Sequence, residues 1–256
     1  MNQEIFQIFL WVMSAVALVV FIALYFVKAG YGMFRTASWG ISINNKLAWV
    51  LMEAPVFIVM FGLWGKSGAG FVVQVYFFFL LFQMQYLLRA FIFPFLLKGK
   101  SRMPVAIMAM GIVFNLLNGM MQAGGLFYFA PEGLYADGWA YLLKPHALLG
   151  VILFFAGMFV NLHSDYVIRH LRKPGDTKHY LPGKGLYRYV TSANYFGELV
   201  EWTGFAILTA SPAAWVFVWW TFANLVPRAD AIHRRYREEF GDEAVGKRKR
   251  IIPFLY

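Results

Sequence analysis

Long apolar runs constrain this chain more than any other feature. Residues 5–27 contain no charged side chain and are long enough to cross the roughly 30 Å hydrocarbon core of a bilayer as one helix. Six further apolar runs follow, at 47–64, 70–97, 104–121, 145–162, 195–210 and 212–226. The last two are short, and Ser211-Pro212 between them predicts a helical hairpin. We expect seven membrane-spanning helices.

The composition also favours a membrane protein. Of the 256 residues, 60% are hydrophobic and 14% are charged, whereas about 25% of the residues in an ordinary soluble domain are charged. We therefore expect an all-α integral membrane protein that forms a single seven-helix domain over residues 1–256, without a β-sheet. The chain has no cysteine, which excludes a disulfide scaffold and a thiolate metal site. Its five histidines lack ligand spacing, so we expect no metal.

The positive charges predict the orientation of the bundle. Twenty of the 23 lysines and arginines fall in four segments, 28–46, 98–103, 163–194 and 227–256. Seven alternating spans put all four segments on one side, which the positive-inside rule makes cytoplasmic, with the N-terminus outside. Anionic membrane lipid or an anionic nucleotide cofactor would suit this basic face. No folded basic module for nucleic acid is present.

Ionisable residues occur inside the spans, where they are costly and usually mark a site. Glu53 lies in the middle of the second span, and Tyr86 and Arg89 are three residues apart, hence on one helical face. We interpret these three residues as functional, because two charged groups at that depth exceed what helix packing needs. The same spacing recurs in two other pairs, Asn115 with Asn118 and Glu198 with Glu201. For the asparagines, a site and interhelical hydrogen bonding are equally open.

A second polar cluster follows the fifth span. Asn161 and Asp165 are four residues apart, so both face the same way as the helix leaves the membrane. Arg169 and Arg172 continue on a neighbouring face, and Lys173-Pro-Gly is expected to end the helix. An acid, an amide and arginines on adjacent turns suit ribose and phosphate recognition, although arginines next to a membrane are also ordinary.

At these residues the chain resembles the steroid 5α-reductases. The resemblance rests on three stretches of the C-terminal half: Asn161-x-His-Ser-Asp165-Tyr with Leu-Arg-Lys-Pro-Gly175, then Pro182-Gly-Lys-Gly-Leu-Tyr187, then Ala193-Asn-Tyr-Phe-Gly-Glu198-x-x-Glu201-Trp-x-Gly204. Sparser matches follow in order through the N-terminal half: Gly30-Tyr31-Gly32, Trp49-x-x-x-Glu53-x-Pro55, Tyr86-x-x-Arg89, Asn118-Gly119 and Asp137-Gly138-Trp139.

The resemblance implies a seven-helix membrane enzyme that uses NADPH to reduce the Δ4 double bond of a 3-oxo steroid. It assigns Glu53 and Tyr86 to the steroid carbonyl, and we add Arg89 and Asn118 to the same substrate site. It assigns a larger set to the cofactor: Asn161, Asp165, Arg172, Asn194, Glu198, Arg228 and Tyr236, with Lys98 and Arg102 as phosphate contacts. Two positions depart from the family pattern, Tyr180 in place of an arginine and Ile232 in place of a histidine. A bacterial inner membrane or an endoplasmic-reticulum-type membrane is the expected location.

The chemistry of enone reduction is consistent with this assignment. Hydride addition to the far carbon of an enone pushes negative charge onto the carbonyl oxygen, and a donor that binds this oxygen more strongly as charge develops lowers the barrier. Tyr86 offers a phenol, and Glu53 offers a carboxylic acid among apolar neighbours. A flat, apolar substrate would reach a membrane-embedded pocket through lipid, whereas an anionic cofactor would enter from water at the basic face.

Other functions remain open at this point. Tyr236-Arg-Glu-Glu-Phe-Gly241 resembles the membrane methyltransferases of the isoprenylcysteine type, but the Arg-His-Pro of that group is replaced by Thr191-Ser-Ala in this chain. Reductases of enoyl-CoA or polyprenol substrates share the expected architecture, and no residue separates them. A small transporter or a lipid-binding protein would be favoured if nucleotides left the melting temperature unchanged.

Overall fold

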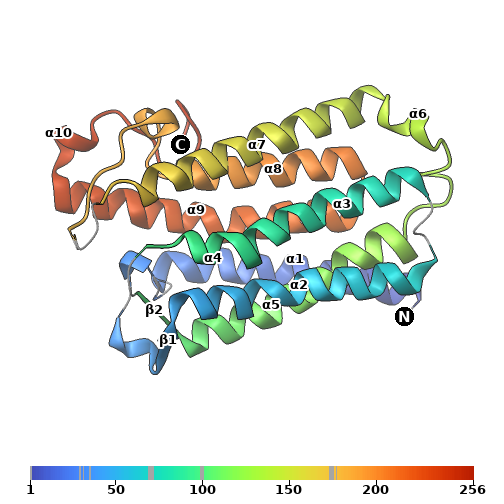
Figure 1. The fold of residues 1–256 in the computed structure, drawn as a ribbon, viewed down its shortest axis with the longest axis horizontal. Coiled ribbons are helices and arrows are strands. Elements are labelled where there is room, and N and C mark those ends of the chain that lie inside the picture. The colour runs from blue at the N-terminus through green and yellow to red at the C-terminus, as the bar shows by residue number, and fades with distance from the viewer. Residues whose placement is uncertain are drawn as a thin grey trace.

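The fold is a bundle of long helices that run side by side (Figure 1). In the computed structural model, the described residues are 2–28, 30, 32–34, 36–68, 72–98, 101–172, 176 and 178–256. The long helices are α1 (Gln3–Phe26), α2 (Asn45–Ser67), α3 (Val73–Leu87), α5 (Val105–Ala123), α7 (Pro145–Arg169), α8 (Ala193–Thr209) and α9 (Pro212–Phe240). Short helices are α4 (Phe93–Leu96), α6 (Trp139–Leu142) and α10 (Asp242–Val245). The expectation of a mostly helical protein is confirmed.

Five of these helical stretches are long and apolar enough to cross a membrane. They are α1, α2, α7 and two helices with their continuations, Val73–Leu96 and Val105–Tyr128. The chain is therefore a multi-pass membrane protein by length and composition. The helix α8 has 17 residues, and α9 has 29. These two helices follow the predicted sixth and seventh apolar runs, but they are not among the five.

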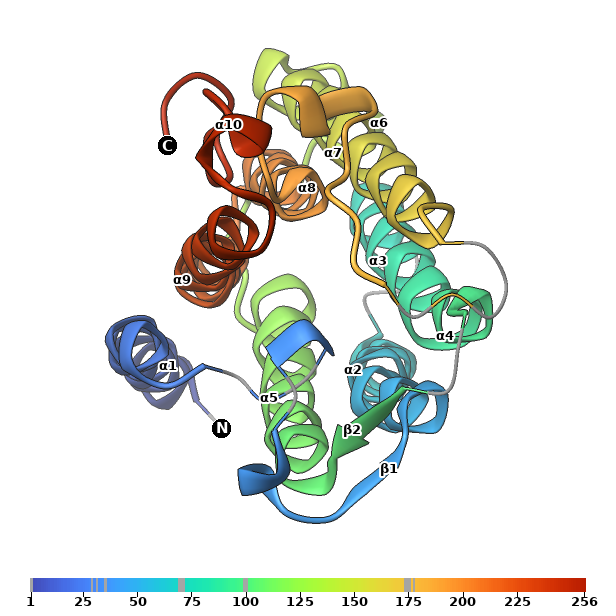
Figure 2. The ribbon, with the colours of Figure 1, turned by 90° about the vertical axis from the view of Figure 1, so that its left-hand side faces the viewer.

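The described parts of the four basic segments lie at one end of the bundle, which we call the basic end. Figures 1 and 2 show that α10, the C-terminus and the segments before α2 and α5 all lie at this end. The N-terminus and α6 lie at the opposite end (Figure 1). The charge asymmetry of the sequence is thus an asymmetry of the folded bundle.

A small sheet at the basic end corrects our expectation that no sheet would form. Strand β1 (Ser42–Asn44) pairs with β2 (Arg102–Pro104) in antiparallel fashion, with Ile43 opposite Met103. The pairing follows from the packing of α2 against α5, because the segments that lead into these two helices then run next to each other. Three residues per strand satisfy backbone groups that these loops would otherwise leave unpaired.

Two helices differ in length from the predicted spans. The helix α9 continues through Pro227 to Phe240, beyond the expected end at residue 226, and its polar second half extends the basic end. The helix α7 continues beyond residue 162 and ends at Arg169. The expected stop signal at 173–175 lies outside the described residues, as does Tyr31 of the Gly30-Tyr31-Gly32 motif. As predicted, Ser211-Pro212 turns the chain between α8 and α9.

Four glycines bring the backbones of α7 and α8 into direct contact. A Cβ on Gly157 would lie 2.3 Å from the backbone nitrogen of Glu201, and one on Gly197 would lie 2.4 Å from that of Asn161. Gly150 and Gly204 make equivalent contacts toward the other end of the pair. Small residues allow such close helix packing in membranes. This contact fixes Asn161 against the start of α8.

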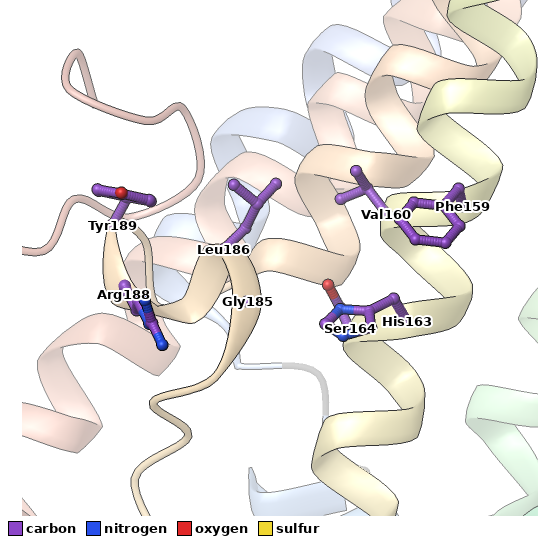
Figure 3. Close-up of a pocket in the computed structure, with 8 residues that line it drawn as sticks. All are labelled: Phe159, Val160, His163, Ser164, Gly185, Leu186, Arg188 and Tyr189. Atoms are coloured by element: carbon purple, nitrogen blue, oxygen red, sulfur yellow. The ribbon is translucent and has the colours of Figure 1, made fainter.

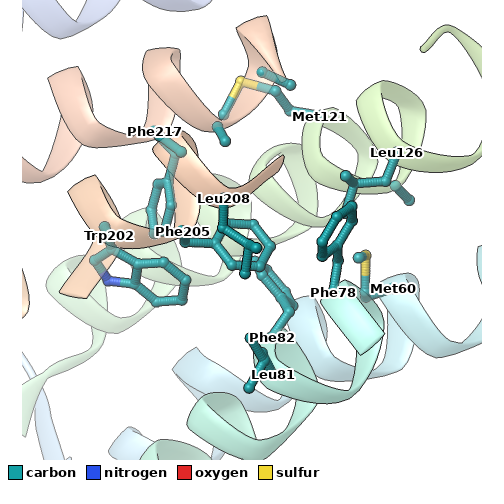
Figure 4. Packing of buried hydrophobic residues seen from close by; sticks show 14 of the residues in the cluster. Met60, Phe78, Leu81, Phe82, Met121, Leu126, Trp202, Phe205, Leu208 and Phe217 are labelled. Carbon is teal, nitrogen blue, oxygen red and sulfur yellow. The ribbon is translucent and has the colours of Figure 1, made fainter. Parts of the chain in front are cut away.

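An aromatic core fills the centre of the bundle (Figure 4). Trp202 of α8 packs against Phe217 of α9, with ring centroids 4.7 Å apart, and against Phe82 of α3 at 5.7 Å. Phe82 in turn contacts the ring of Tyr86 at 4.7 Å. Tyr86 lies one turn beyond Phe82 on α3, nearer the basic end. The aromatic core therefore packs against the side of the Tyr86 ring that faces away from the basic end.

At the end opposite the basic end, the segment 129–144 is attached to α8 by hydrogen bonds from two tyrosines. Tyr135 donates a hydrogen bond to the carbonyl of Thr209 at 2.6 Å, and Tyr141 donates one to the carbonyl of Leu208 at 2.9 Å. Both acceptors belong to the last turn of α8, whose carbonyls have no partner within the helix. The side chain of Gln74 donates to the carbonyl of Tyr135. The loop therefore seals the C-terminal end of α8.

Candidate functional site

Arg89 connects two acidic side chains from different helices. Its Nε lies 3.9 Å from Oε1 of Glu53 on α2, and its Nη1 lies 3.2 Å from Oε2 of Glu198 on α8. The guanidinium also lies over the ring of Trp49, 5.5 Å from the ring centroid. The structure thus brings together three of the ionisable residues that the sequence singled out. We call Glu53, Tyr86, Arg89, Asn115, Asn118 and Glu198 the central cluster.

Arg89 lies in a π-helical segment, Leu88–Ile92, that interrupts α3. Pro94 follows directly in α4, and proline cannot donate a backbone hydrogen bond and crowds the carbonyl four residues earlier. A π segment widens the turn and shifts the residues after it around the axis, and such segments often occur at functional sites. The simple spacing of Tyr86 and Arg89 could not reveal this change of register.

Asn115 holds Glu53 from α5. Its Nδ2 lies 2.7 Å from the carbonyl of Met52 and 3.4 Å from Oε2 of Glu53. Both side chains are buried. The two carboxylate oxygens of Glu53 therefore face different partners, with Arg89 at one oxygen and Asn115 at the other.

Asn118 holds Tyr86 in the same way. Its Nδ2 donates to the Tyr86 hydroxyl oxygen at 3.1 Å, and its own Oδ1 accepts from Gln122 at 3.4 Å. Since the hydroxyl oxygen of Tyr86 accepts from Asn118, the phenolic proton is left for another acceptor. Glu53, Arg89 and Glu198 all lie within electrostatic range of this hydroxyl. Asn115 and Asn118 both form hydrogen bonds between helices, and both contact candidate catalytic groups. Interhelical hydrogen bonding and a place in the candidate site are therefore compatible for this pair.

A second group of polar side chains lies where α7 meets the start of α8. Asn161 donates to the carbonyl of Asn194 at 2.9 Å, and Asn194 donates to Oδ1 of Asp165 at 3.1 Å. Tyr187 donates to Oδ1 of Asn194 at 3.4 Å. We call Asn161, Asp165, Asn194 and Tyr187 the α7–α8 cluster. The predicted common face of Asn161 and Asp165 is confirmed, because both reach Asn194.

The two clusters are adjacent. Asp165 lies within electrostatic range of Arg89, the cation of the central cluster. The other member of the predicted acidic pair, Glu201, accepts a hydrogen bond from Gln85 at 3.1 Å inside the bundle and lies within electrostatic range of Glu198 and Arg89. The two glutamates therefore have different partners, Arg89 for Glu198 and Gln85 for Glu201.

Arg228 and Tyr236 lie on the polar half of α9. The Nε of Arg228 donates to the hydroxyl of Tyr195 at 2.7 Å, and its guanidinium lies 5.9 Å from the ring of Phe34. Tyr236 is half-buried near Tyr195, and burial first, then the neighbouring tyrosine, raises the pKa of its phenol to about 12. It is therefore a neutral hydrogen-bond donor at physiological pH.

The remaining predicted cofactor cations lie at the surface of the basic end. Lys98 and Arg172 are exposed, and Arg102 donates from Nε to the carbonyl of Ser42 at 3.0 Å. Among the described residues, no contact joins Lys98 or Arg102 to either cluster. At the two positions that depart from the family pattern, Tyr180 donates to Asp176 at 2.6 Å, and Ile232 is half-buried beside buried His233.

Several contact partners were not predicted from the sequence. Trp49 under Arg89, Tyr187 on Asn194, and Tyr195 with Phe34 around Arg228 all contact candidate functional groups. Aromatic residues make up 20% of the chain, so no single aromatic position gives a signal of its own. Only the fold selects these four.

The groups available suit a dinucleotide cofactor. The side chains of Arg89 and Glu198 keep 22% and 15% of their surface exposed, so the junction of the clusters is reachable from outside the protein. Amides and a carboxylate there can bind ribose hydroxyls and a carboxamide. Arginines and a lysine toward the basic end can bind phosphates. The donor set therefore fits a cofactor that has a polar head and an anionic tail.

Fold and site together define an integral-membrane enzyme with a buried polar site near the basic end of a helical bundle. Comparison with known proteins specifies the family. The family model described as 3-oxo-5-alpha-steroid 4-dehydrogenase matches residues 101–256. The chain belongs to this family of oxidoreductases, the steroid 5α-reductases.

Relatives from animals and plants match most of the chain. The 3-oxo-5-alpha-steroid 4-dehydrogenase 1 of Bos taurus is 35% identical over 247 residues, which cover 94% of this chain and 93% of the bovine protein. The steroid 5-alpha-reductase DET2 of Gossypium hirsutum is 34% identical and covers 100% of this chain and 99% of the plant protein. The human 3-oxo-5-alpha-steroid 4-dehydrogenase 1 is 37% identical over 88% of this chain and 86% of its own length. This membership does not favour the methyltransferase alternative.

Proposed function

We propose that the chain reduces the Δ4 double bond of a 3-oxo-Δ4 steroid with NADPH, the hydride going to C5, and that Glu53 and Tyr86 polarise the 3-oxo group. One observation supports this proposal above the others. The Tyr86 hydroxyl accepts from Asn118 and lies within electrostatic range of Glu53, so its proton remains available to bind the carbonyl oxygen of a substrate.

The role of the two residues follows from where charge develops. Addition of hydride to C5 moves an electron pair onto the carbonyl oxygen. Donors already fixed in position stabilise that charge without reorganisation, and one such donor is typically worth about 2.7–4 kcal/mol of barrier. Asn118 positions Tyr86, and Asn115 with Arg89 positions Glu53. The substrate site is therefore Glu53, Tyr86, Arg89 and Asn118.

We assign the cofactor to the α7–α8 cluster and the adjacent cations. When bound, NADPH supplies the hydride. Asn161, Asp165, Asn194 and Glu198 provide the amides and carboxylates for its nicotinamide and ribose parts. Phosphates fall to the residues nearer the basic end: Arg172, Arg228, Tyr236, Lys98 and Arg102. Among these, Arg102 would have to exchange its contact with the carbonyl of Ser42.

Orientation in the membrane follows from the same charge distribution. We infer seven spans in a single domain over residues 1–256, with α8 and α9 completing the five apolar helices, the N-terminus outside and the basic end in the cytoplasm. The cofactor then enters from water at the basic end. The apolar steroid reaches Glu53 and Tyr86 from lipid.

The test compares two isosteric variants with a control on the same helix. Purified protein should consume NADPH when given a Δ4-3-oxo steroid, and Glu53→Gln and Tyr86→Phe should each lower kcat about 100-fold or more. Both should leave the Kd for NADPH within a factor of about three. Tyr76→Phe is the matched control, because Tyr76 is exposed on α3 and its hydroxyl has no partner among the described residues. Unchanged turnover in both variants would refute the mechanism.

A thermal unfolding experiment tests the identity of the cofactor. NADPH should raise the melting temperature of the protein, and S-adenosylmethionine should not. Protection by S-adenosylmethionine alone would point to a methyltransferase instead.

A further inference from the structure

A cavity of about 380 Å³ lies between α7 and the 3-10 turn Gly185–Arg188 (Figure 3). Phe159 and His163 form its wall on α7, and Arg188 and Tyr189 form the wall opposite. Its volume falls within the range of about 300–1,000 Å³ that is usual for ligand sites. It is separate from the α7–α8 cluster, because residues 159 and 163 lie on the side of the helix opposite Asn161 and Asp165.

The cavity carries positive charge without acidic partners. Among the described residues, no carboxylate pairs with Arg188, with His163, or with exposed Lys184 at the start of the same turn. None of the eight residues that line the cavity is acidic. A guanidinium and an imidazole that face one space with no counterion favour an anionic ligand.

The walls of the cavity are fixed by the fold. The His163 ring stacks on Phe159, with centroids 6.0 Å apart and an interplanar angle of 18°. It also lies against Gly185, whose φ is +59° and where a Cβ would come within 2.5 Å of the imidazole. The C-terminal segment supports the opposite wall, because the backbone nitrogen of Lys249 donates to the carbonyl of Tyr189 at 2.8 Å.

The cavity lies where the apolar part of α7 ends. The predicted fifth span stops at residue 162, and Phe159 is 70% exposed on the same face as other outward apolar residues of α7, such as Ile152 and Phe155. Tyr189 contacts the ring of Phe254 at 5.1 Å, and Phe254 is 79% exposed. Aromatic side chains of this kind are typical of the membrane–water interface. In the membrane orientation proposed above, the cavity would therefore lie at the membrane–water interface.

We propose that this cavity binds the headgroup of an anionic phospholipid. The phosphate binds Arg188 and the imidazole N–H of His163, and an acyl chain descends along Phe159 and Phe155. No carboxylate lines the cavity to pair with the ammonium of a zwitterionic headgroup, so the lining favours a headgroup with net negative charge. A soluble phosphate would use the same cations but would gain nothing from the apolar wall.

Lipid retention on the intact protein tests this proposal. The purified chain is delipidated in detergent and titrated with phosphatidylglycerol or phosphatidylcholine, and bound lipid is counted by native mass spectrometry. We expect phosphatidylglycerol to bind more tightly, with an affinity that falls about tenfold in Arg188→Gln and in His163→Ala. Arg188→Lys should recover part of the loss because it keeps the charge. Arg235→Gln is the control. It removes an exposed cation at the same end of the bundle, and this cation is paired with Glu239.

Three results would overturn the proposal. The first is equal binding of the two lipids by the wild-type protein. The second is equal loss of phosphatidylglycerol in Arg188→Gln and Arg235→Gln, which would mean that total charge alone attracts the lipid. The third is displacement of phosphatidylglycerol by equimolar glycerol 3-phosphate, which would make the ligand a soluble anion. Size-exclusion chromatography should show that Arg188→Gln and Arg188→Lys elute as folded protein. Their lipid binding can then be compared with that of the wild-type protein.

Discussion

The Nη1 of Arg89 lies 3.2 Å from Oε2 of Glu198, while its Nε lies 3.9 Å from Oε1 of Glu53. One guanidinium thus lies between an acidic side chain of the proposed substrate site and one of the proposed cofactor site. Arg89 is only partly exposed, so the Glu198 carboxylate depends on it for charge compensation.

Arg89→Ala should therefore destabilise the fold as well as abolish activity. Removal of one partner from a buried ion pair costs about 3–5 kcal/mol, and we expect about 3 kcal/mol because the site is partly open. Unfolding in a denaturing detergent measures this loss. Adding Glu198→Gln to Arg89→Ala should recover part of the stability, since one uncompensated charge is removed. If the double variant is no more stable than Arg89→Ala, the pair with Glu198 is not the dominant interaction.

Asn118→Ala should affect turnover through Tyr86. Loss of this hydrogen bond leaves the phenol free to rotate, and a net hydrogen bond of about 1 kcal/mol predicts a decrease in kcat of about fivefold to tenfold. The Kd for NADPH should not change. Asn118→Asp should not restore turnover, because its carboxylate would accept the phenolic proton that the substrate carbonyl needs. Loss of turnover in both variants would support a positioning role for Asn118. A fall in NADPH affinity with normal kcat would contradict it.

The glycine contact between α7 and α8 gives a prediction about stability. Gly157→Ala places a Cβ 2.3 Å from the backbone of Glu201, which cannot move without separating the helices. Overpacking of this kind typically costs about 1–3 kcal/mol, and a lower melting temperature should report it. Gly62→Ala in α2 is the control, because nothing lies within 4 Å of its added Cβ. Equal melting temperatures for the two variants would show that the backbones are not in contact.

Tyr135 and Tyr141, which bind the last carbonyls of α8, should both contribute to the stability of the fold. Tyr135→Phe and Tyr141→Phe each remove one hydrogen bond to a terminal carbonyl and should each cost about 1 kcal/mol of unfolding free energy. Since the acceptors are adjacent residues in a shared turn, the double variant should deviate from additivity. Strict additivity measured by denaturation would mean that the two contacts act independently.

The pH dependence of stability should include His233, which lies on α9 beyond the proposed seventh span. Burial first, and then Arg250 and Arg237, lower the pKa of its imidazole, although Asp230 and Asp242 act in the opposite direction. The folded state thus binds its proton less readily than the unfolded chain does. The contribution of His233 to stability is present above the unfolded pKa of about 6.5 and is lost as pH falls toward the lowered folded pKa.

Replacement of His233 isolates this contribution. Between pH 7.5 and 5.5, the wild-type protein should lose more thermal stability than His233→Gln, which can still bond to Thr191. Parallel pH profiles for the two proteins would mean that the His233 pKa is not lowered in the folded state.

Helical spacing predicted contacts wherever the helices stayed regular. Asn161 and Asp165 meet Asn194 because four residues make one turn of an uninterrupted α7. Regular spacing was not sufficient to place Arg89, because it lies in a π segment that changes its direction relative to Tyr86. In the sequence, only the position of Pro94 indicates that segment. Partners such as Trp49 and Asn115 lie on other helices, and periodicity within one helix carries no information about them.

The glycines of α7 and α8 illustrate a second kind of limit. Gly150 and Gly157, like Gly197 and Gly204, are seven residues apart, a spacing that permits close packing but does not identify the partner helix. The small β1–β2 sheet was missed for a similar reason. Three-residue strands have no periodicity to detect, and they pair only because α2 and α5 have already brought them together.

With backbone against backbone at four glycines, α7 and α8 have no cushion of side chains over which to slide or rotate. Sliding or rotation of one helix against the other is therefore disfavoured, and we expect the amides and carboxylate of the pair to keep their separations when a ligand binds. In the proposed function, adaptation to substrates of different shape then falls to the helices that bear Glu53 and Tyr86.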